Sequence, residues 1–435
     1  MKADEWRSFI NSSKGEAALG QLYGRWPQVI RQQQARYTAL VDKFNALYPA
    51  ESGVDPSKSG VELFSSPGRT EVGGNHTDHN GGRVLAAAVD LDIIAAVGKT
   101  GDGLITLNSE GYPPLVVDTR QLEVQPAERT TSAGLLRGIC ARLTELKRPI
   151  GGFKACLSSR LPNGAGLSSS AAFELMMAVI LNELYNDGKI PPLLLAQVGQ
   201  YAENVYFGKP SGLMDQTTIA VGGFVTIDFK DFAAPLVRKV KYDFASSGYN
   251  LVIVETGGDH ADLTEEYAAI ATEMKAVAQA LGGKLLRDVS LSKLQAHLPA
   301  LRQQVGDRAI LRAMHFFGDD QRVVDQVQAL EQGQFSRFLE LVNESGRSSW
   351  MLLQNCYTTS QPARQGISLA LALSEQKLHS RGAWRVHGGG FAGTIQAFMP
   401  TDQVADYVAA LDAVFGKGAC HPVLVRQAGA ACIFK

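Results

Sequence analysis

Charged and hydrogen-bonding side chains are concentrated in a glycine-rich stretch, SSPGRTEVGGNHTDHNGG, at residues 65–82. Glycine lets the backbone approach a ligand closely, and carboxylate, imidazole and guanidinium groups suit a hydroxyl-rich ligand. The stretch therefore predicts one wall of a binding site, and the alternative is a flexible polar loop. His76, Asp78 and His79 could instead ligate a metal, but the sequence has no matching histidine or cysteine cluster elsewhere, which disfavours a metal centre.

A second stretch, LPNGAGLSSSAAFE at residues 161–174, combines a glycine-rich turn with three serines and the start of an apolar helical pattern. Backbone N–H groups, serine hydroxyls and the positive end of a helix can together hold phosphate oxygens. The stretch predicts a phosphate-binding loop, and the alternative is a serine-capped helix after a turn. The Walker A pattern does not occur in the sequence.

A literal GxGxxG pattern runs from Gly388 to Gly393, but the following TIQAF alternates like a strand. A dinucleotide-binding fingerprint needs a helix at that point, so we expect a tight turn that supports some other site. Two carboxylates are isolated in the sequence. Asp215, in SGLMDQ, is either a turn residue or a catalytic group, and Glu203 by itself is compatible with a surface position.

Strands and helices must position these candidate groups. Their order along the chain lacks the regular β–α alternation of a parallel doubly wound fold, so we predict a mixed α+β protein. Strand patterns occupy residues 83–100, 104–109, 151–162, 224–229, 249–258, 384–399 and 421–434. Helical patterns occupy residues 21–48, 171–186, 192–208, 262–283 and most of 285–375. Asp262 and Glu265 have the spacing of a capping box at the start of one helix. A domain boundary is expected near Asn250.

Composition excludes several classes of protein. The chain has 435 residues, a net charge of -1 and 20% charged residues, so it lacks the excess of basic residues that binds nucleic acid. The chain has five cysteines, an odd number, and none of them forms a CxxC pair, which fits a reducing compartment. They are Cys140, Cys156, Cys356, Cys420 and Cys432. The N-terminal sequence MKADEWRSFINSSKG lacks the pattern of a signal peptide, so we expect a cytoplasmic protein without a membrane partner.

Three blocks of the sequence, PGRTEVGGNHTDHNGG, LPNGAGLSSSAAFE and HGGGFAGT, resemble the signature segments of the GHMP small-molecule kinases in their usual order, over roughly residues 65–398. The first block resembles the galactokinase branch, as do RAMHFFGDDQRV and VNESGRSS. The resemblance implies a kinase that uses ATP to phosphorylate the C1 hydroxyl of a galactose-type hexose. It also implies a ribosomal protein S5 domain 2-like lobe at residues 1–250, which binds sugar and ATP, and a ferredoxin-like lobe at residues 251–435.

The resemblance also assigns roles to residues. The triphosphate of ATP would be bound by Gly164, Gly166, Ser168, Ser169 and Ser170. Ser170 and Glu203 would hold Mg²⁺, a hard cation that prefers oxygen ligands. Asp215 would face the reacting sugar hydroxyl, with Arg69 beside it to stabilise negative charge. The sugar itself would contact Asn75, His76, Asp78, Gly212 and Tyr267.

The first block departs from the galactokinase pattern GRVNLIGEHTDYNGG, because Asn75 replaces the glutamate that binds the C6 hydroxyl and His79 replaces a tyrosine. A glutamate repels a C6 carboxylate by about 4 kcal/mol at about 4 Å, whereas asparagine can donate a hydrogen bond to it. In both respects the block resembles plant galacturonic acid kinases. ETGGDH at residues 255–260 also differs from the usual NSNVRH. Galacturonate or another C6-modified sugar is therefore the alternative to galactose.

Two further classes share parts of the pattern. Non-catalytic relatives of galactokinase bind ATP and galactose as sensors, but some have lost residues from the serine segment, which is complete here. Kinases of mevalonate or homoserine need no HxD pair like that of His76 and Asp78. We therefore expect an enzyme that acts as a monomer on a small-molecule sugar and ATP.

Overall fold

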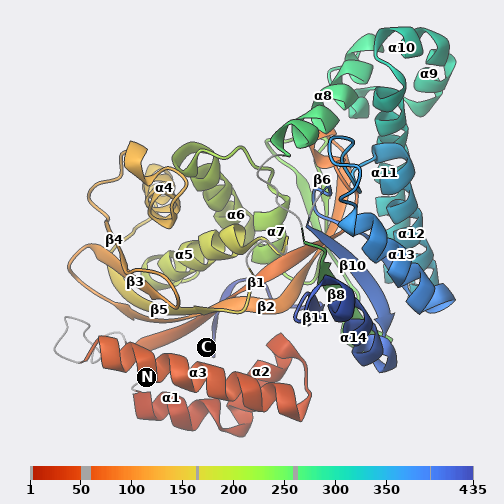
Figure 1. Cartoon of the computed structure of the whole chain (residues 1–435). Coiled ribbons are helices and arrows are strands. Elements are labelled where there is room, and N and C mark those ends of the chain that lie inside the picture. Colours follow the sequence, from red (N-terminus) through yellow and green to blue (C-terminus); the bar gives the residue numbers. More distant parts are fainter. Residues whose placement is uncertain (1–2, 50–59, 163–165, 258–262, 392, 435) are drawn as a thin grey trace.

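The structure is a computed structural model that describes residues 3–49, 60–162, 166–257, 263–391 and 393–434 (Figure 1). Two β-sheets organise these residues. The larger sheet has the strand order β12-β1-β2-β5-β3-β4, with β6 paired to β2 and β7 paired to β6. The smaller sheet has the order β11-β8-β10-β9. Helices pack on both sheets, which confirms the predicted α+β class.

The larger sheet is mainly antiparallel, and its β3–β5 pair is parallel. Its strands are β1 (Val61–Gly73), β2 (Arg83–Lys99), β3 (Leu104–Ser109), β4 (Leu115–Asp118), β5 (Phe153–Ser159), β6 (Phe224–Asp228), β7 (Leu236–Val240) and β12 (Ala431–Ile433). The helices on it are α1 (Ala3–Ile10), α2 (Ser13–Tyr23), α3 (Pro27–Leu47), α4 (Ser132–Glu145), α5 (Ser169–Asn186), α6 (Pro192–Tyr201) and α7 (Met214–Val221).

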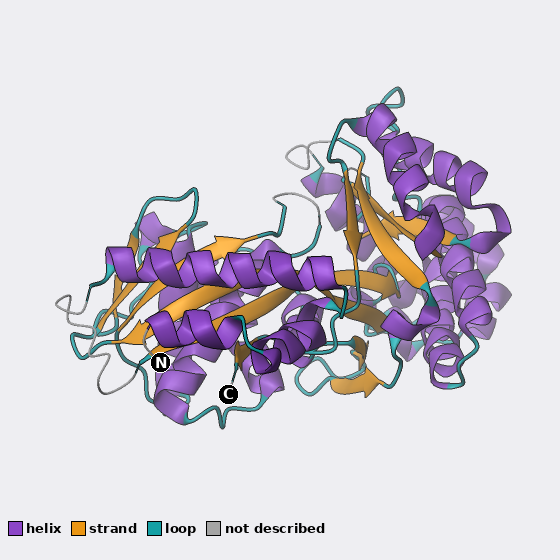
Figure 2. Cartoon of the chain, turned by 90° about the horizontal axis from the view of Figure 1, so that it is seen from below, coloured by secondary structure: helices purple, strands orange, loops and turns teal. Residues whose placement is uncertain are grey.

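Alternation along the strands gives the larger sheet two buried faces. On β1, Phe64 packs toward α4–α7, whereas its neighbour Leu63 packs toward α1–α3. On β2, Ala95 and Ala96 divide between the two faces in the same way. Figure 1 shows α4–α7 above this sheet and α1–α3 below it, and Figure 2 shows the long helix α3 lying across the strands.

A buried polar cluster joins the N-terminal helices to the sheet. Asp92 of β2 is fully buried and accepts hydrogen bonds from Tyr23, Arg36, Ser65 and Arg426. The Arg36 and Arg426 nitrogens lie 2.6 and 3.1 Å from the Asp92 carboxylate. These contacts connect α2, α3, β1 and the chain segment before β12, so the N-terminal helices are an integral part of the sheet's packing.

The smaller sheet is antiparallel throughout. Its strands are β8 (Tyr249–Glu255), β9 (Ala383–His387), β10 (Thr394–Pro400) and β11 (Cys420–Val423). The helices that follow β8 in the chain are α8 (Thr264–Ala280), α9 (Leu291–Ala296), α10 (Leu298–Gln304), α11 (Asp307–Glu331), α12 (Phe335–Ser348), α13 (Gly366–Leu378) and α14 (Val404–Phe415). Asn250, near which the sequence predicts a domain boundary, lies in β8, and β12 belongs to the larger sheet.

Two local features differ from expectation. The segment predicted as a polar binding stretch begins inside a strand, because β1 runs through Pro67 and Gly68 to Gly73. Shifts in pairing register between Pro67 and Arg69, and again between Glu71 and Gly73, accommodate residues that are otherwise rare in strands. Helix α8 has Leu263 as its N-cap, without a side-chain cap. The predicted cap, Asp262, lies outside the described residues.

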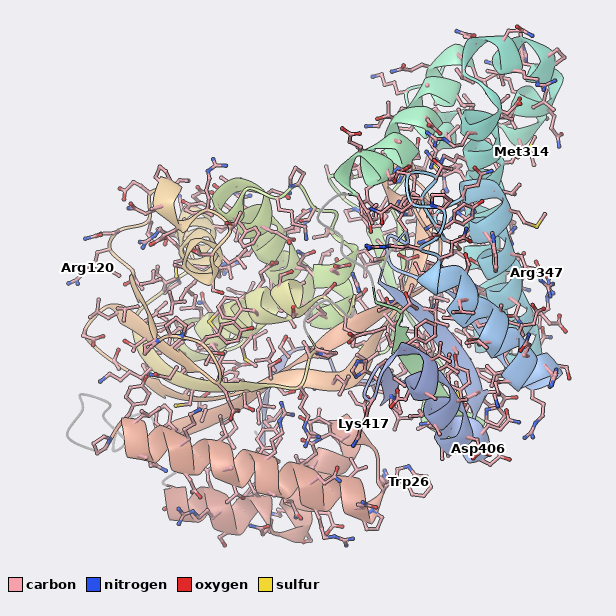
Figure 3. All side chains as sticks on the ribbon, in the orientation of Figure 1. Trp26, Arg120, Met314, Arg347, Asp406 and Lys417 are labelled. Carbon is pink, nitrogen blue, oxygen red and sulfur yellow. The ribbon has the colours of Figure 1, made fainter. Side chains whose placement is uncertain are left out.

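Large apolar side chains on the surface are scattered. Trp26 is 64% exposed and lies in the turn before α3, where Figure 3 shows it projecting outward. Across the described parts of the chain, no helix is both long enough and apolar enough to span a bilayer.

Candidate active site

An ion pair between Arg69 of β1 and Asp215 in the first turn of α7 lies at the centre of the candidate site. Arg69 Nε and one of its terminal nitrogens each lie 2.6 Å from an oxygen of Asp215. The arginine side chain is 9% exposed and the aspartate side chain 30% exposed, so the carboxylate remains accessible. A bidentate pair of this kind fixes the direction of the carboxylate.

The serine loop reaches this ion pair directly. The Ser168 hydroxyl donates a hydrogen bond to Asp215 Oδ2, and Arg69 donates to the carbonyl of Gly166. Ser168 has a left-handed backbone with φ of 58°, which is uncommon outside glycine and concentrates at functional sites. A Cβ on Gly68 would lie 2.9 Å from the Leu167 carbonyl, so this glycine permits the close approach of β1 and the loop.

The ion pair also controls the charge of Asp215. Burial by itself would raise the pKa of Asp215, but the Arg69 guanidinium and the Ser168 hydroxyl hold it below its usual value. Asp215 is therefore a carboxylate at neutral pH. It can accept a proton or a hydrogen bond from a ligand hydroxyl while Arg69 stabilises negative charge beside it.

A set of carboxylate and amide oxygens that could bind a metal ion lies next to the Arg69–Asp215 ion pair. The Gln216 amide donates to Glu203 Oε2 at 2.9 Å and to Glu174 Oε2 at 3.0 Å. Burial, and then the charge of Glu203, raise the pKa of Glu174 well above its usual value. Lys209 Nζ lies 3.4 Å from Glu203. Ser170 lies one turn before Glu174 on the same face of α5.

This oxygen set fits a hard divalent cation better than a soft metal. Glu174 Oε1 and Gln216 Oε1 are buried and have no hydrogen-bond partner among the described residues. No group of three or more histidine, cysteine, aspartate or glutamate side chains in the described parts of the chain could hold a metal. A cation here would therefore depend on a carboxylate, a hydroxyl, water and the phosphates of a nucleotide, which is how Mg²⁺ usually binds.

The first glycine-rich block faces the loop before α7. A Cβ on Gly212 would lie 3.2 Å from Asp78 Oδ2, which brings together two residues predicted to bind a sugar. Asp78 begins the short helix η1 (Asp78–Asn80). The ring of His76 lies 5.6 Å from that of His79, and its Nε2 is 2.9 Å from the Gly389 carbonyl. Burial lowers the pKa of His76, so its imidazole is neutral near pH 7.

Asn75 has a different environment from the one that direct sugar binding requires. Its side chain is completely buried, and its amide nitrogen donates to Glu71 Oε1 and to the Gly388 carbonyl, both at 2.8 Å. Its amide oxygen accepts hydrogen bonds from Asn355 and Ser349. In this structure the Asn75 amide supports its neighbours, whereas the sequence predicts that it contacts a sugar.

The third glycine block is held by side chains from several elements. Asn355 donates to the Gly389 carbonyl at 3.0 Å, and the Tyr267 hydroxyl of α8 donates to the Gly390 carbonyl at 2.8 Å. A Cβ on Gly389 would lie 2.5 Å from the Tyr267 ring, so only glycine fits there. The strand β10 follows this block, which confirms that it is not a dinucleotide fingerprint.

The structure brings several of the predicted site residues into contact. Arg69, Ser168 and Asp215 are in direct contact, Asp78 faces Gly212, and Tyr267 contacts the third block. Gly164 lies outside the described residues, and the hydroxyls of Ser169 and Ser170 make no hydrogen bond among the described ones. Residues that sequence reasoning missed are Glu71, Glu174, Lys209, Gln216, Asn355 and Arg385. Glu174 and Gln216 lie inside the quoted motifs, but nothing in the sequence shows that they meet.

Two family models match the chain. The GHMP kinases N terminal domain matches residues 134–223, which include the serine loop and α5–α7. The galactokinase galactose-binding signature matches residues 51–99, which include the first glycine-rich block.

Similar proteins agree with these models. A galactokinase from Streptomyces coelicolor is 33% identical over 356 residues, which cover 81% of this chain and 86% of that protein. A galactokinase from Lactococcus lactis is 29% identical over 88% of this chain and 93% of its own length. Among solved structures, Lactococcus lactis galactokinase complexed with galactose superimposes with a TM-score of 0.75 at 24% identity, covering 91% of this chain and all of that one. Mevalonate kinase from Methanococcus jannaschii has a TM-score of 0.60 at 17% identity, covering 83% and 98%.

Proposed function

Since the chain belongs to the galactokinase family, we propose that it is a sugar kinase that transfers the γ-phosphoryl group of ATP to the anomeric C1 hydroxyl of a galactose-type hexose. The observation that carries this proposal is the contact of Asp215 with both Arg69 and the serine loop. One acidic group thereby lies between the expected phosphate-binding segment and the expected sugar-binding block.

The proposed reaction requires no covalent intermediate with the enzyme. The C1 oxygen of the sugar forms a bond to the γ-phosphorus, the bond from that phosphorus to the ADP oxygen breaks, and the hydroxyl proton passes to Asp215. Arg69 keeps the carboxylate ionised and stabilises charge on the transferred group. Alignment of the two substrates supplies much of the remaining rate acceleration.

Each substrate has a set of proposed ligands. Ser168, Ser169 and the backbone at Gly164 and Gly166 bind the triphosphate, aided by the N-terminus of α5. Ser170 and Glu203 hold Mg²⁺, which neutralises phosphate charge when bound. The sugar contacts His76, Asp78, Gly212 and Tyr267. We further propose that the protein acts as a cytoplasmic monomer.

A coupled assay of ADP release tests the function. We expect turnover with galactose when galactose, galacturonate, talose and galactosamine are compared, and ³¹P NMR should place the phosphate on C1. No ADP release with any of these sugars would contradict the proposal. Binding of sugar and ATP without ADP release would instead indicate a sensor.

A further inference from the structure

The first block exchanges two residue types relative to the galactokinase pattern. In GRVNLIGEHTDYNGG an asparagine stands four positions before the glutamate, whereas this chain has Glu71 four positions before Asn75. The two side chains touch, since the Asn75 amide nitrogen lies 2.8 Å from Glu71 Oε1. The block therefore keeps one carboxylate and one amide as a bonded pair, with their positions reversed.

Asn75 has no capacity left for a ligand. Both of its amide hydrogens have acceptors, Glu71 Oε1 and the Gly388 carbonyl, and its oxygen has two donors. A primary amide offers two donors and two acceptor positions, so this side chain is saturated. Its exposed fraction is 0%. A sugar carboxylate could receive a hydrogen bond from Asn75 only if one of these bonds broke.

Glu71 differs in each of these respects. Its Oε1 accepts from Asn75 and from Arg385, whose nitrogen lies 3.0 Å away, but its Oε2 has no hydrogen-bond partner among the described residues. The side chain keeps 8% of its surface exposed. Glu71 and Arg69 are two residues apart in a regular part of β1, so their side chains project from the same face of the strand.

The surroundings of Glu71 place it at the site. Burial raises the pKa of Glu71 to about 7. The charges of Arg385 and Arg69 and the hydrogen bond from Asn75 act to lower it, and the charge of Asp78 acts to raise it. Arg69 and Asp78 are thus close enough to interact with this carboxyl. They are also the two residues that flank the expected sugar position.

We propose that Glu71 determines sugar specificity, with Oε2 accepting a hydrogen bond from a sugar hydroxyl while Asn75 and Arg385 hold Oε1 in place. This inference rests on the proposed sugar kinase function and selects the sugar class. When it is ionised, the Glu71 carboxylate only accepts hydrogen bonds, which favours a neutral hexose and repels a uronate. The glutamate that the family has at position 75 is thereby replaced by Glu71 as the carboxylate that contacts the sugar.

Sugar binding by calorimetry tests this, with the full chain saturated by a non-hydrolysable ATP analogue. We expect wild type to bind galactose at least about tenfold more tightly than galacturonate, since like charges repel in a partly buried site. Glu71→Gln has nearly the same shape but no charge. It should weaken galactose binding about tenfold, the effect of losing a hydrogen bond to a charged group. It should also lower the ratio of the galactose affinity to the galacturonate affinity.

Two further variants separate the proposed role from a purely structural one. Asn75→Glu alone places a second carboxylate against Glu71 and should lower the melting temperature without improving galactose binding. The double variant Glu71→Asn with Asn75→Glu restores the family order and should recover galactose binding relative to Glu71→Gln. A matched control is Glu273→Gln, which removes a carboxylate from another fully buried arginine, Arg312. It should lower stability and leave the sugar preference unchanged.

The outcomes distinguish this inference from the proposed function. If wild type releases ADP with galactose but Glu71→Gln leaves the ratio of the two sugar affinities unchanged, Glu71 is not a specificity residue. Equal affinity of wild type for galactose and galacturonate overturns the inference as well. If wild type binds the ATP analogue but neither binds nor phosphorylates any sugar, the kinase function itself fails.

Discussion

Replacing Asp215 by asparagine tests the central claim about the site. The substitution keeps the shape of the side chain and removes its negative charge and its ability to accept a proton. A positioned general base contributes about 10²- to 10⁴-fold to rate, which corresponds to about 2.7–5.4 kcal/mol of activation free energy. We therefore expect kcat to fall by about that factor, with the KM of sugar and of ATP within about threefold of wild type.

The structure also sets the expected cost in stability. Asp215 receives two hydrogen bonds from Arg69 and one from Ser168, and its side chain is 30% exposed. Asparagine can keep one or two of these bonds. The free energy of unfolding should fall by about 1.5–3 kcal/mol, the usual worth of one hydrogen bond to a charged group. The variant should therefore fold and bind both substrates.

Three measurements on the same preparation check this prediction: coupled ADP release, calorimetric binding of galactose and an ATP analogue, and chemical denaturation. Asp228→Asn is a matched control, because Asp228 is also paired with arginine, at 3.0 Å from Arg83 and 2.9 Å from Arg287. It should lose stability and keep kcat within about twofold. A kcat for Asp215→Asn within fivefold of wild type would refute the role of this carboxylate in proton transfer.

Three more predictions concern the metal, the N-terminal helices and pH. Chelation of divalent cations should abolish ADP release, and added Mg²⁺ should restore it. Glu203→Gln should raise the Mg²⁺ concentration required for half-maximal activity at least about tenfold, because a carboxylate ligand is lost. An unchanged Mg²⁺ requirement would exclude Glu203 as a ligand. Asp92→Ala leaves Arg36 and Arg426 buried without their counter-charge, so denaturation should show a loss of about 3–5 kcal/mol, and a loss below about 1 kcal/mol would contradict the structural role given to this cluster. Burial lowers the pKa of His79 to about 4, so between about pH 6.5 and 4 only the unfolded chain takes up the proton. Wild type should therefore lose up to about 3 kcal/mol relative to His79→Phe as pH falls through that range, and parallel pH profiles of stability would show that His79 titrates normally.

Local patterns in the sequence predicted the elements that carry the site. Alternation and apolar composition located β2, β3, β5, β6 and β8, and the serine-containing turn before α5 was visible as a glycine-rich segment followed by a helical pattern. These features depend on residues close together in the chain, where propensity and periodicity act directly. The sequence did not predict the strand β1, because Pro67 and Gly68 lower its strand propensity. Pairing with β2 and β12 stabilises this strand in the fold.

The sequence also predicted that Arg69, Ser168 and Asp215 belong to one site, through the order of the three blocks. Their contacts were not derivable, since Arg69 and Asp215 are 146 positions apart in the chain and meet only when β1 packs against α5 and α7. The hydrogen-bond partners of Asn75 outside the first block could not be predicted either, because they are distant in the sequence. Gly388 and Asn355 come from the other end of the chain, and they convert an amide that looks available in the sequence into a saturated one.

The residue types by themselves determined the chemistry of this protein: a glycine and serine loop suited to phosphate, a carboxylate with an arginine, and a polar block suited to a sugar. Tertiary structure decided which of these groups remain accessible to a ligand. Hydrogen-bond capacity is finite, so a side chain can contact a substrate only if folding leaves a donor or acceptor unused. That condition separates Glu71 from Asn75, and it depends on neighbours that are distant in the sequence and adjacent only in the fold.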